Sequence, residues 1–306
     1  MSLIALLKPK GPSGFGYGST AEEVSAGLSL AGKTYLVTGC NSGLGKETLR
    51  VLALRGARVL GTARTVDKAR AACAEVGGAE ATGFACELAD PASVRACVAA
   101  VIEDGARLDG ILCNAGIMAL QQRETAFGVE LQFFTNHVGH FILVTGLLDR
   151  LADDGRVVMT SSSAHTAAPP GGVVLDDLGS ERGYRPWVAY GQSKIANILF
   201  ARALARRFAG GRRTANAVHP GVIATNLGRH MPAPVRLGLA VAKPLFLKSA
   251  AQGAATQVYV AIHPDAAARS GEYFADCNVA TARADAGDPE LARRLWEATE
   301  AIVARV

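Results

Sequence analysis

The sequence lacks the features that mark several large classes of protein. Its six cysteines form no CxxC pair and have no histidine at metal-ligand spacing, so we expect reduced core cysteines and no metal site. Aromatic residues make up only 6% of the chain and are not interleaved with its scattered arginines, which argues against nucleic-acid binding. No apolar run approaches the ~20 residues that a membrane span requires. We therefore expect a cytoplasmic protein with no transmembrane segment.

Acidic residues are absent from positions 182–264, although the whole chain carries a net charge of only +5. This segment holds twelve of the basic residues. A solvated helix face is the simpler interpretation, and an anionic substrate or a peripheral membrane contact is the alternative.

Hydrophobic residues make up 49% of the 306-residue chain, enough for a large buried core. Short β-branched runs alternate with longer Ala/Leu/Arg segments, which is typical of repeated βαβ units. We predict an α/β fold with one Rossmann-type, doubly wound parallel sheet of about seven strands and helices on both faces. The expected strands are 34–39, 57–63, 81–86, 108–114, 155–161, 213–219 and 271–275.

The chain divides into a Gly/Ser/Pro-rich N-terminal extension, residues 1–30, and one domain, residues 31–306. Ser19 or Thr20 precedes Glu22 and Glu23 in a pattern that predicts a capping box. A long connection at about 222–250 follows the sixth strand, where substrate loops of such sheets lie. Ala-rich faces at 187–209 and 246–264 suggest a homo-oligomer.

The first strand runs into TGCNSGLG and then into a helical segment. Glycines in this context allow backbone N–H groups at a helix N-terminus to approach a pyrophosphate. The second strand ends in Ala63 and Arg64 rather than in the carboxylate that binds the NAD ribose, so we expect NADP(H), with Lys46 and Arg64 on its 2′-phosphate. The loop residues predicted to bind the cofactor are Gly39, Asn41, Ser42, Gly43, Leu44, Gly45 and Lys46.

Tyr190 and Lys194 lie four residues apart in YGQSK, which places them on one face of a helix. A nearby ammonium stabilises tyrosinate, so we expect Lys194 to lower the pKa of Tyr190 toward a value useful for proton transfer. Three serines, Ser161 to Ser163, end the fifth strand, where any one of them could donate to a substrate carbonyl. Asn114 ends the fourth strand, and Asn136 lies on the following helix.

Together these motifs make the chain resemble the short-chain dehydrogenase/reductase family over roughly residues 30–280. NHVGHF, SSSAH, YGQSKIAN, HPGVIAT and GEYFADC look most like the branch of retinol dehydrogenases and protochlorophyllide-reductase-like proteins. The resemblance implies that Asn136 serves a proton relay, Ser162 polarises the carbonyl, Tyr190 is the general acid/base and Lys194 also holds the nicotinamide ribose. It further implies cofactor contacts from Glu87, Leu88, Asn114, Ala115, Gly116, Pro220, Gly221 and Thr225. Glu87-Leu88 departs from the Asp-Leu that is common beside the adenine.

We expect an NADP(H)-dependent ketoreductase that transfers hydride between nicotinamide and a carbonyl or alcohol of a small apolar or aromatic substrate. Carbon–carbon double-bond reduction of the protochlorophyllide-reductase type and a non-catalytic NADP(H)-sensing protein are the alternatives. His137 and His140 are expected to pack in the core rather than to bind metal. Tyr184 and Trp187 either line the substrate pocket or pack the loop before the Tyr190 helix.

Overall fold

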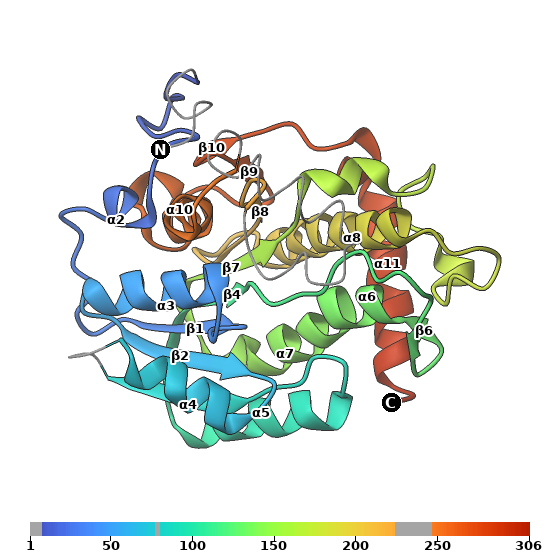
Figure 1. Cartoon of the computed structure of the whole chain (residues 1–306), viewed down its shortest axis with the longest axis horizontal. Helices are drawn as coiled ribbons and strands as arrows, with labels where there is room; N and C mark the ends of the chain where they lie inside the picture. The colour runs from blue at the N-terminus through green and yellow to red at the C-terminus, as the bar shows by residue number, and fades with distance from the viewer. Residues whose placement is uncertain (1–7, 77–79, 224–246) are drawn as a thin grey trace.

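The computed structural model describes residues 8–76, 80–223 and 247–306. Within these residues, one eight-stranded sheet runs in the order β10-β9-β8-β7-β4-β1-β2-β3 (Figure 1). Its strands are β1 (Thr34–Thr38), β2 (Arg58–Ala63), β3 (Ala81–Ala85), β4 (Leu108–Cys113), β7 (Leu151–Thr160), β8 (Thr214–His219), β9 (Tyr273–Ala275) and β10 (Asn278–Val279).

All seven predicted strands are present and pair in parallel. The prediction of about seven strands missed β10, which pairs antiparallel with β9. The turn between them has positive φ at Asp276 and Cys277; aspartate is common at such a position, but Cys277 stands where these turns usually have glycine. β7 also begins at Leu151 instead of residue 155, because Leu151 pairs with Leu108 through an irregularity in the register.

Helices cover both faces of the sheet, as predicted (Figure 1). One buried cluster joins the sheet to α5 (Pro91–Glu103), α7 (Gly139–Leu147), α8 (Pro186–Arg207) and α11 (Pro289–Val303). The other joins it to α2 (Ala21–Val24), α3 (Gly43–Leu54), α4 (Val66–Ala74) and α10 (Ala250–Ile262). Side chains of β1 alternate between the clusters, since Leu36 belongs to the first and Tyr35 and Val37 to the second.

Short elements complete the connections. They are β5 (Thr125–Ala126), β6 (Val129–Glu130), α6 (Leu131–Phe133), the π-helical η1 (Phe134–Val138), and the 3₁₀ turns η2 (Leu148–Arg150), η3 (Ser163–Ala167), η4 (Leu175–Asp177), η6 (Pro264–Ala266) and η7 (Ala284–Gly287).

The N-terminal extension packs against the C-terminal part of the chain. The predicted capping box forms at Thr20, whose side chain accepts from Glu23 while the Glu23 carboxylate accepts from Thr20 N–H. Gln252 on α10 donates to the carbonyl of Gly18 at 3.2 Å. Asn278 accepts from the N–H of Ser13 at 3.0 Å.

The alanines proposed to pair between copies are already covered within the chain. Ala196 and Ala203 on α8 and Ala254 on α10 are at most 1% exposed. α11 packs along α8 in the same chain (Figure 1). These alanines therefore give no support to the predicted homo-oligomer.

The chain order of the strands creates a switch point between β1 and β4. From β1 the chain builds outward through β2 and β3, then returns to place β4 on the other side of β1. In sheets of this kind the crevice at the carboxyl ends of such strands receives the ligand. The glycine-rich turn and Asn114 follow those two strands.

Candidate active site

The turn between β1 and α3 depends on glycine. Gly39 and Gly43 have positive φ, +68° and +54°. A Cβ at Gly45 would lie 2.2 Å from the carbonyl oxygen of Gly39, so no larger residue fits there without movement of the backbone. The side chain of Ser42, the N-cap, makes no hydrogen bond to α3, which leaves the first-turn N–H groups without a side-chain cap. This cradle fits a pyrophosphate.

The other residues of the glycine-rich loop differ in their exposure to solvent. Asn41, Ser42 and Gly43 are exposed at the tip. Leu44 is half-buried and faces α10, where its Cδ2 lies 2.6 Å from the point that a Cβ on Gly253 would occupy. The tip of the loop is therefore open to solvent, and Leu44 anchors the loop against α10.

Asn114 and Ala115 tie the end of β4 to the glycine turn. The Asn114 side chain donates to the carbonyl of Thr38 at 2.9 Å, and the N–H of Ala115 donates to the Thr38 hydroxyl at 2.9 Å. Gln257 on α10 donates to Asn114 Oδ1 at 3.3 Å. The predicted residues of the two loops thus lie side by side, as one cofactor cleft requires.

Lys46 and Arg64, the two cations predicted to bind the 2′-phosphate, differ in whether their charge is already paired. Lys46 forms an ion pair with Glu75, the C-cap of α4. Arg64 is exposed directly after β2, and its side chain makes no ion pair or hydrogen bond within the described residues. In this conformation Arg64, but not Lys46, has its charge free for an anionic group.

Glu87 and Leu88 follow β3. The Glu87 carboxylate accepts from the N–H of Ala89 at 3.2 Å and is half-buried. Leu88 is buried, and its carbonyl oxygen lies 2.3 Å from the point that a Cβ on Gly139 would occupy. Leu88 therefore packs against the start of α7. The Glu87 side chain is held by a hydrogen bond within its own turn.

Asn136 occupies the π-helical turn η1, where it is fully buried. Its Oδ1 accepts from the N–H of Ile117 at 2.9 Å, and its Nδ2 donates to the carbonyl of Ile117 and to the hydroxyl of Ser193, both at 2.9 Å. Asn136 Oδ1 and Lys194 Nζ lie 2.8 and 3.6 Å from the point that a Cβ on Gly116 would occupy. A side chain at Gly116 would therefore crowd the Asn136 amide, and glycine lets this segment lie close to both Asn136 and Lys194.

Tyr190 and Lys194 share one face of α8, as predicted. Lys194 Nζ lies 5.4 Å from the centroid of the Tyr190 ring and donates to the carbonyl of Thr160 at 3.1 Å. Burial lowers the pKa of Lys194 to about 8. Burial raises the pKa of Tyr190 to about 12, against a smaller lowering by the Ser162 hydroxyl. The expected lowering of the Tyr190 pKa is therefore not present in this structure, because removal of the phenol from water outweighs its polar partners.

The three serines after β7 have separate environments. The Ser161 hydroxyl donates to the carbonyl of Lys194 at 2.8 Å and is buried. Ser163 is exposed. Ser162 alone interacts with Tyr190, and its hydroxyl accepts from the N–H of Ala164 at 3.1 Å as the N-cap of η3. Of the three alternatives, the geometry favours Ser162.

Pro220 and Gly221 follow β8 on the same edge of the sheet. Gly221 has φ of +93°, and a Cβ there would lie 2.7 Å from Cδ of the buried Lys248. Thr225 lies outside the described residues, as does most of the predicted substrate loop at 222–250.

Tyr184 and Trp187 differ in role. The Tyr184 hydroxyl donates to the carbonyl of Leu120 at 2.7 Å and accepts from Gln132 at 3.0 Å, so this side chain packs the loop. Trp187 is 48% exposed, and its ring lies edge-on to that of Tyr190 at 6.1 Å between centroids. Trp187 is therefore an aromatic side chain available to a substrate beside Tyr190.

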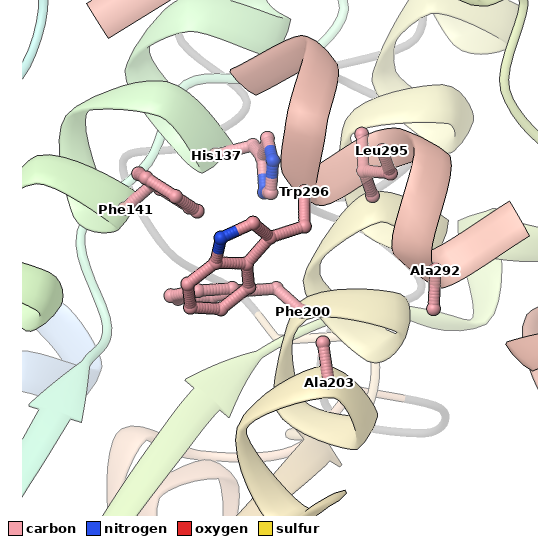
Figure 2. A pocket seen from close by; sticks show the side chains of 7 residues that line it. All are labelled: His137, Phe141, Phe200, Ala203, Ala292, Leu295 and Trp296. Atoms are coloured by element: carbon pink, nitrogen blue, oxygen red, sulfur yellow. The ribbon is translucent and has the colours of Figure 1, made fainter. Parts of the chain in front are cut away.

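His137 and His140 are buried, and Figure 2 shows His137 beside the aromatic side chains of Phe141 and Trp296. His137 contacts the hydroxyl of Thr299 at 3.0 Å and packs edge-on against Phe200. His140 contacts the Thr38 hydroxyl at 2.9 Å and the carbonyl of Asn136 at 3.0 Å. Within the described residues, no group of three metal-ligating side chains is found.

Sequence reasoning missed three supporting residues, Thr38, Ser193 and Gln257. Thr38 was detectable in principle, because it ends β1 directly before the glycine turn. Ser193 and Gln257 act from helices that are distant in sequence from Asn136 and Asn114. Contacts between residues so far apart in the sequence cannot be predicted from a local sequence pattern.

Comparison with known proteins agrees with this geometry. Residues 33–175 match the family described as short chain dehydrogenase. The chain is 39% identical over 303 residues to short-chain dehydrogenase TIC 32 B, chloroplastic, of Brassica napus, covering 94% of this chain and 93% of the relative. It is 39% identical over 299 residues to retinol dehydrogenase 14 of Mus musculus, covering 90% and 86%.

Among solved structures, a short chain dehydrogenase from Burkholderia cenocepacia J2315 in complex with NADP superposes with a TM-score of 0.64 at 27% identity, covering 80% of this chain and 96% of that one. No helix in the described part of the chain has the length and apolarity needed to span a membrane. The protein is an NAD(P)-dependent oxidoreductase, and the chain belongs to the short-chain dehydrogenase/reductase family, close to its retinol dehydrogenase branch.

Proposed function

We propose that this protein is an NADP(H)-dependent ketoreductase that interconverts a carbonyl and an alcohol on a small apolar or aromatic substrate. The observation that carries the proposal is the convergence of Ser162, Tyr190, Lys194 and Asn136 beside the glycine-rich cleft. Each of them is an acid, a donor or a relay group, as proton transfer at a carbonyl requires.

The roles follow from the contacts. In the reductive direction Ser162 and Tyr190 hold the substrate oxygen, and Tyr190 supplies the proton; the bound nicotinamide cofactor supplies the hydride. The Lys194 ammonium, 5.4 Å from the centroid of the Tyr190 ring, would favour the tyrosinate form against the effect of burial, and a water held near Asn136 would complete the relay. The exposed ring of Trp187 offers apolar surface beside Tyr190.

NADP(H) is favoured over NAD(H) by the end of β2. No carboxylate stands at Ala63 or Arg64 to bind a ribose 2′-hydroxyl, and the Arg64 guanidinium is exposed where a 2′-phosphate needs a cation. The Burkholderia relative was solved with NADP, which adds support. Cytoplasmic location stays a prediction, since one relative is named as chloroplastic.

The test is a panel of aromatic and aliphatic ketones, aldehydes, quinones and α,β-unsaturated ketones, each with NADPH and with NADH. We expect NADPH oxidation with carbonyl substrates and alcohol as the product. Saturation of a carbon–carbon double bond with the carbonyl retained would favour the double-bond reductase. Tight NADPH binding without turnover of any member would favour the sensing protein.

A further inference from the structure

The peptide bond between Ser162 and Ser163 is held on both sides by histidine. Its carbonyl oxygen lies 2.6 Å from His165 Nδ1, and its N–H donates to His219 Nδ1 at 3.2 Å. The two histidines come from different elements, η3 and the end of β8. His165 is 3% exposed, and its ring packs edge-on against Tyr273 at 5.0 Å between centroids.

The partners of His165 determine its tautomer. Its Nε2 faces the backbone N–H of Arg283 at 3.2 Å, and that group can only donate. Nε2 must therefore accept and carry no proton, so in the neutral ring the proton is on Nδ1. Nδ1–H then donates to the carbonyl of Ser162, which can only accept.

The partners of His219 require the opposite tautomer. Its Nδ1 faces two donors, the N–H groups of Ser163 at 3.2 Å and of Gly221 at 3.4 Å. Nδ1 must therefore be an acceptor, and the ring proton lies on Nε2. Because Gly221 belongs to the turn after β8, His219 also connects that turn to the Ser162–Ser163 peptide.

We propose that His165 and His219 form a two-histidine clamp that positions Ser162 for its part in the reaction. The two contacts fix the orientation of the Ser162–Ser163 peptide and therefore the backbone position from which the Ser162 side chain extends. The Ser162 hydroxyl in turn interacts with Tyr190. A hydroxyl held in advance costs no reorientation when negative charge develops on the substrate oxygen. Both histidines are positioning residues, and the inference rests on the proposed function.

The surroundings of both rings favour the neutral state that the clamp needs. Burial lowers the pKa of His165; the hydrogen bond to the Ser162 carbonyl and Asp285 act in the opposite direction, and Arg283 lowers the pKa further. Burial lowers the pKa of His219 to about 4. Lys248, Lys8 and His165 lower it as well, whereas Asp276 acts in the opposite direction. Protonation of either ring would set an N–H against a backbone N–H.

The first test needs no substrate. Imidazole ¹⁵N chemical shifts of the full-length protein at pH 7 distinguish the two neutral tautomers, with His165→Asn and His219→Asn used to assign the signals. We expect the Nδ1–H form for His165 and the Nε2–H form for His219. The reverse tautomer at either ring would overturn the clamp while leaving the proposed function intact.

The second test separates positioning from general structure. At each position asparagine can return the lost contact, because its amide nitrogen or oxygen takes the place of Nδ1, whereas leucine cannot. We expect His165→Leu to lower kcat about tenfold or more with the NADPH Kd changed less than threefold, and His165→Asn to recover most of kcat. His219→Leu should lower kcat similarly, with His219→Asn again recovering it.

The double leucine variant gives a further check. Since both rings hold one peptide bond, the loss of kcat in the double variant should be smaller than the product of the two single losses. Asparagine variants as inactive as the leucine variants, at equal thermal stability, would contradict the clamp. If no carbonyl is reduced by wild-type protein, the proposed function fails, and the tautomer measurement still decides the clamp.

Discussion

Replacing Lys194 with methionine removes a buried ammonium while keeping an unbranched side chain of similar reach. Lys194 Nζ lies 5.4 Å from the Tyr190 ring centroid. With this distance to the ring taken as the charge separation and an effective dielectric of about 20, a unit charge stabilises tyrosinate by about 3 kcal/mol. That energy corresponds to roughly a 100-fold change in the acidity of Tyr190. Alcohol oxidation, in which Tyr190 acts as the base, should therefore slow by about 100-fold in Lys194→Met near neutral pH.

The pH dependence makes this prediction specific. Because burial lowers the pKa of Lys194 to about 8, the ammonium is present below pH 8 and is lost as the pH rises above it. The ratio of wild-type to variant kcat for alcohol oxidation with NADP⁺ should therefore be largest below pH 8 and should narrow toward pH 9.5. Lys194→Arg, which keeps the charge, is the control. A ratio that stays constant with pH, or equal rates throughout, would refute the electrostatic role of Lys194.

Three further predictions concern the cofactor cleft and the buried histidines. Gly45→Ala should weaken NADPH binding at least tenfold by calorimetry, because its Cβ would lie 2.2 Å from a backbone oxygen; Gly211→Ala, with its nearest contact at 3.4 Å, should bind normally. Arg64→Glu should raise the Kd for NADPH at least tenfold and leave that for NADH nearly unchanged; equal effects on both would contradict the 2′-phosphate assignment. Burial lowers the pKa of His140 and of His219 from 6.5 to about 4. Between these two pH values the unfolded chain therefore binds more protons than the folded chain. The free energy of unfolding in urea should fall as the pH drops from 6.5 toward 4, by up to about 3 kcal/mol per ring, and a flat profile over that window would count against these environments.

The central strands could be predicted from the sequence because both of their faces are buried. β1, TYLVT, has an apolar centre between two threonines and runs directly into a glycine, a pattern that is recognisable without tertiary information. The glycine turn and the Tyr190–Lys194 pair were likewise local patterns. The π-helical turn that carries Asn136 has no local signal, because its one-residue departure from helical spacing is set by packing around Ile117 and Ser193.

Electrostatic behaviour was harder to predict than position. The ion pair of Lys46 with Glu75 joins residues on different helices, and nothing in either local sequence indicates it. The pKa of Tyr190 depends on burial, which the YxxxK spacing does not report. The local sequence around His165 and His219 does not indicate their role, because that role depends on which backbone groups face each ring nitrogen.

Hydride transfer from NADPH to a carbonyl carbon, with Tyr190 as the proton donor, is the proposed reaction. Its most direct test is reduction of a ketone with NADPH that carries deuterium on the transferring face at C4, followed by mass spectrometry and NMR of the product. We expect one deuteron on the carbinol carbon with wild-type protein, and no product with Tyr190→Phe although that variant still binds NADPH. Deuterium on a carbon–carbon bond, or full activity in Tyr190→Phe, would contradict it.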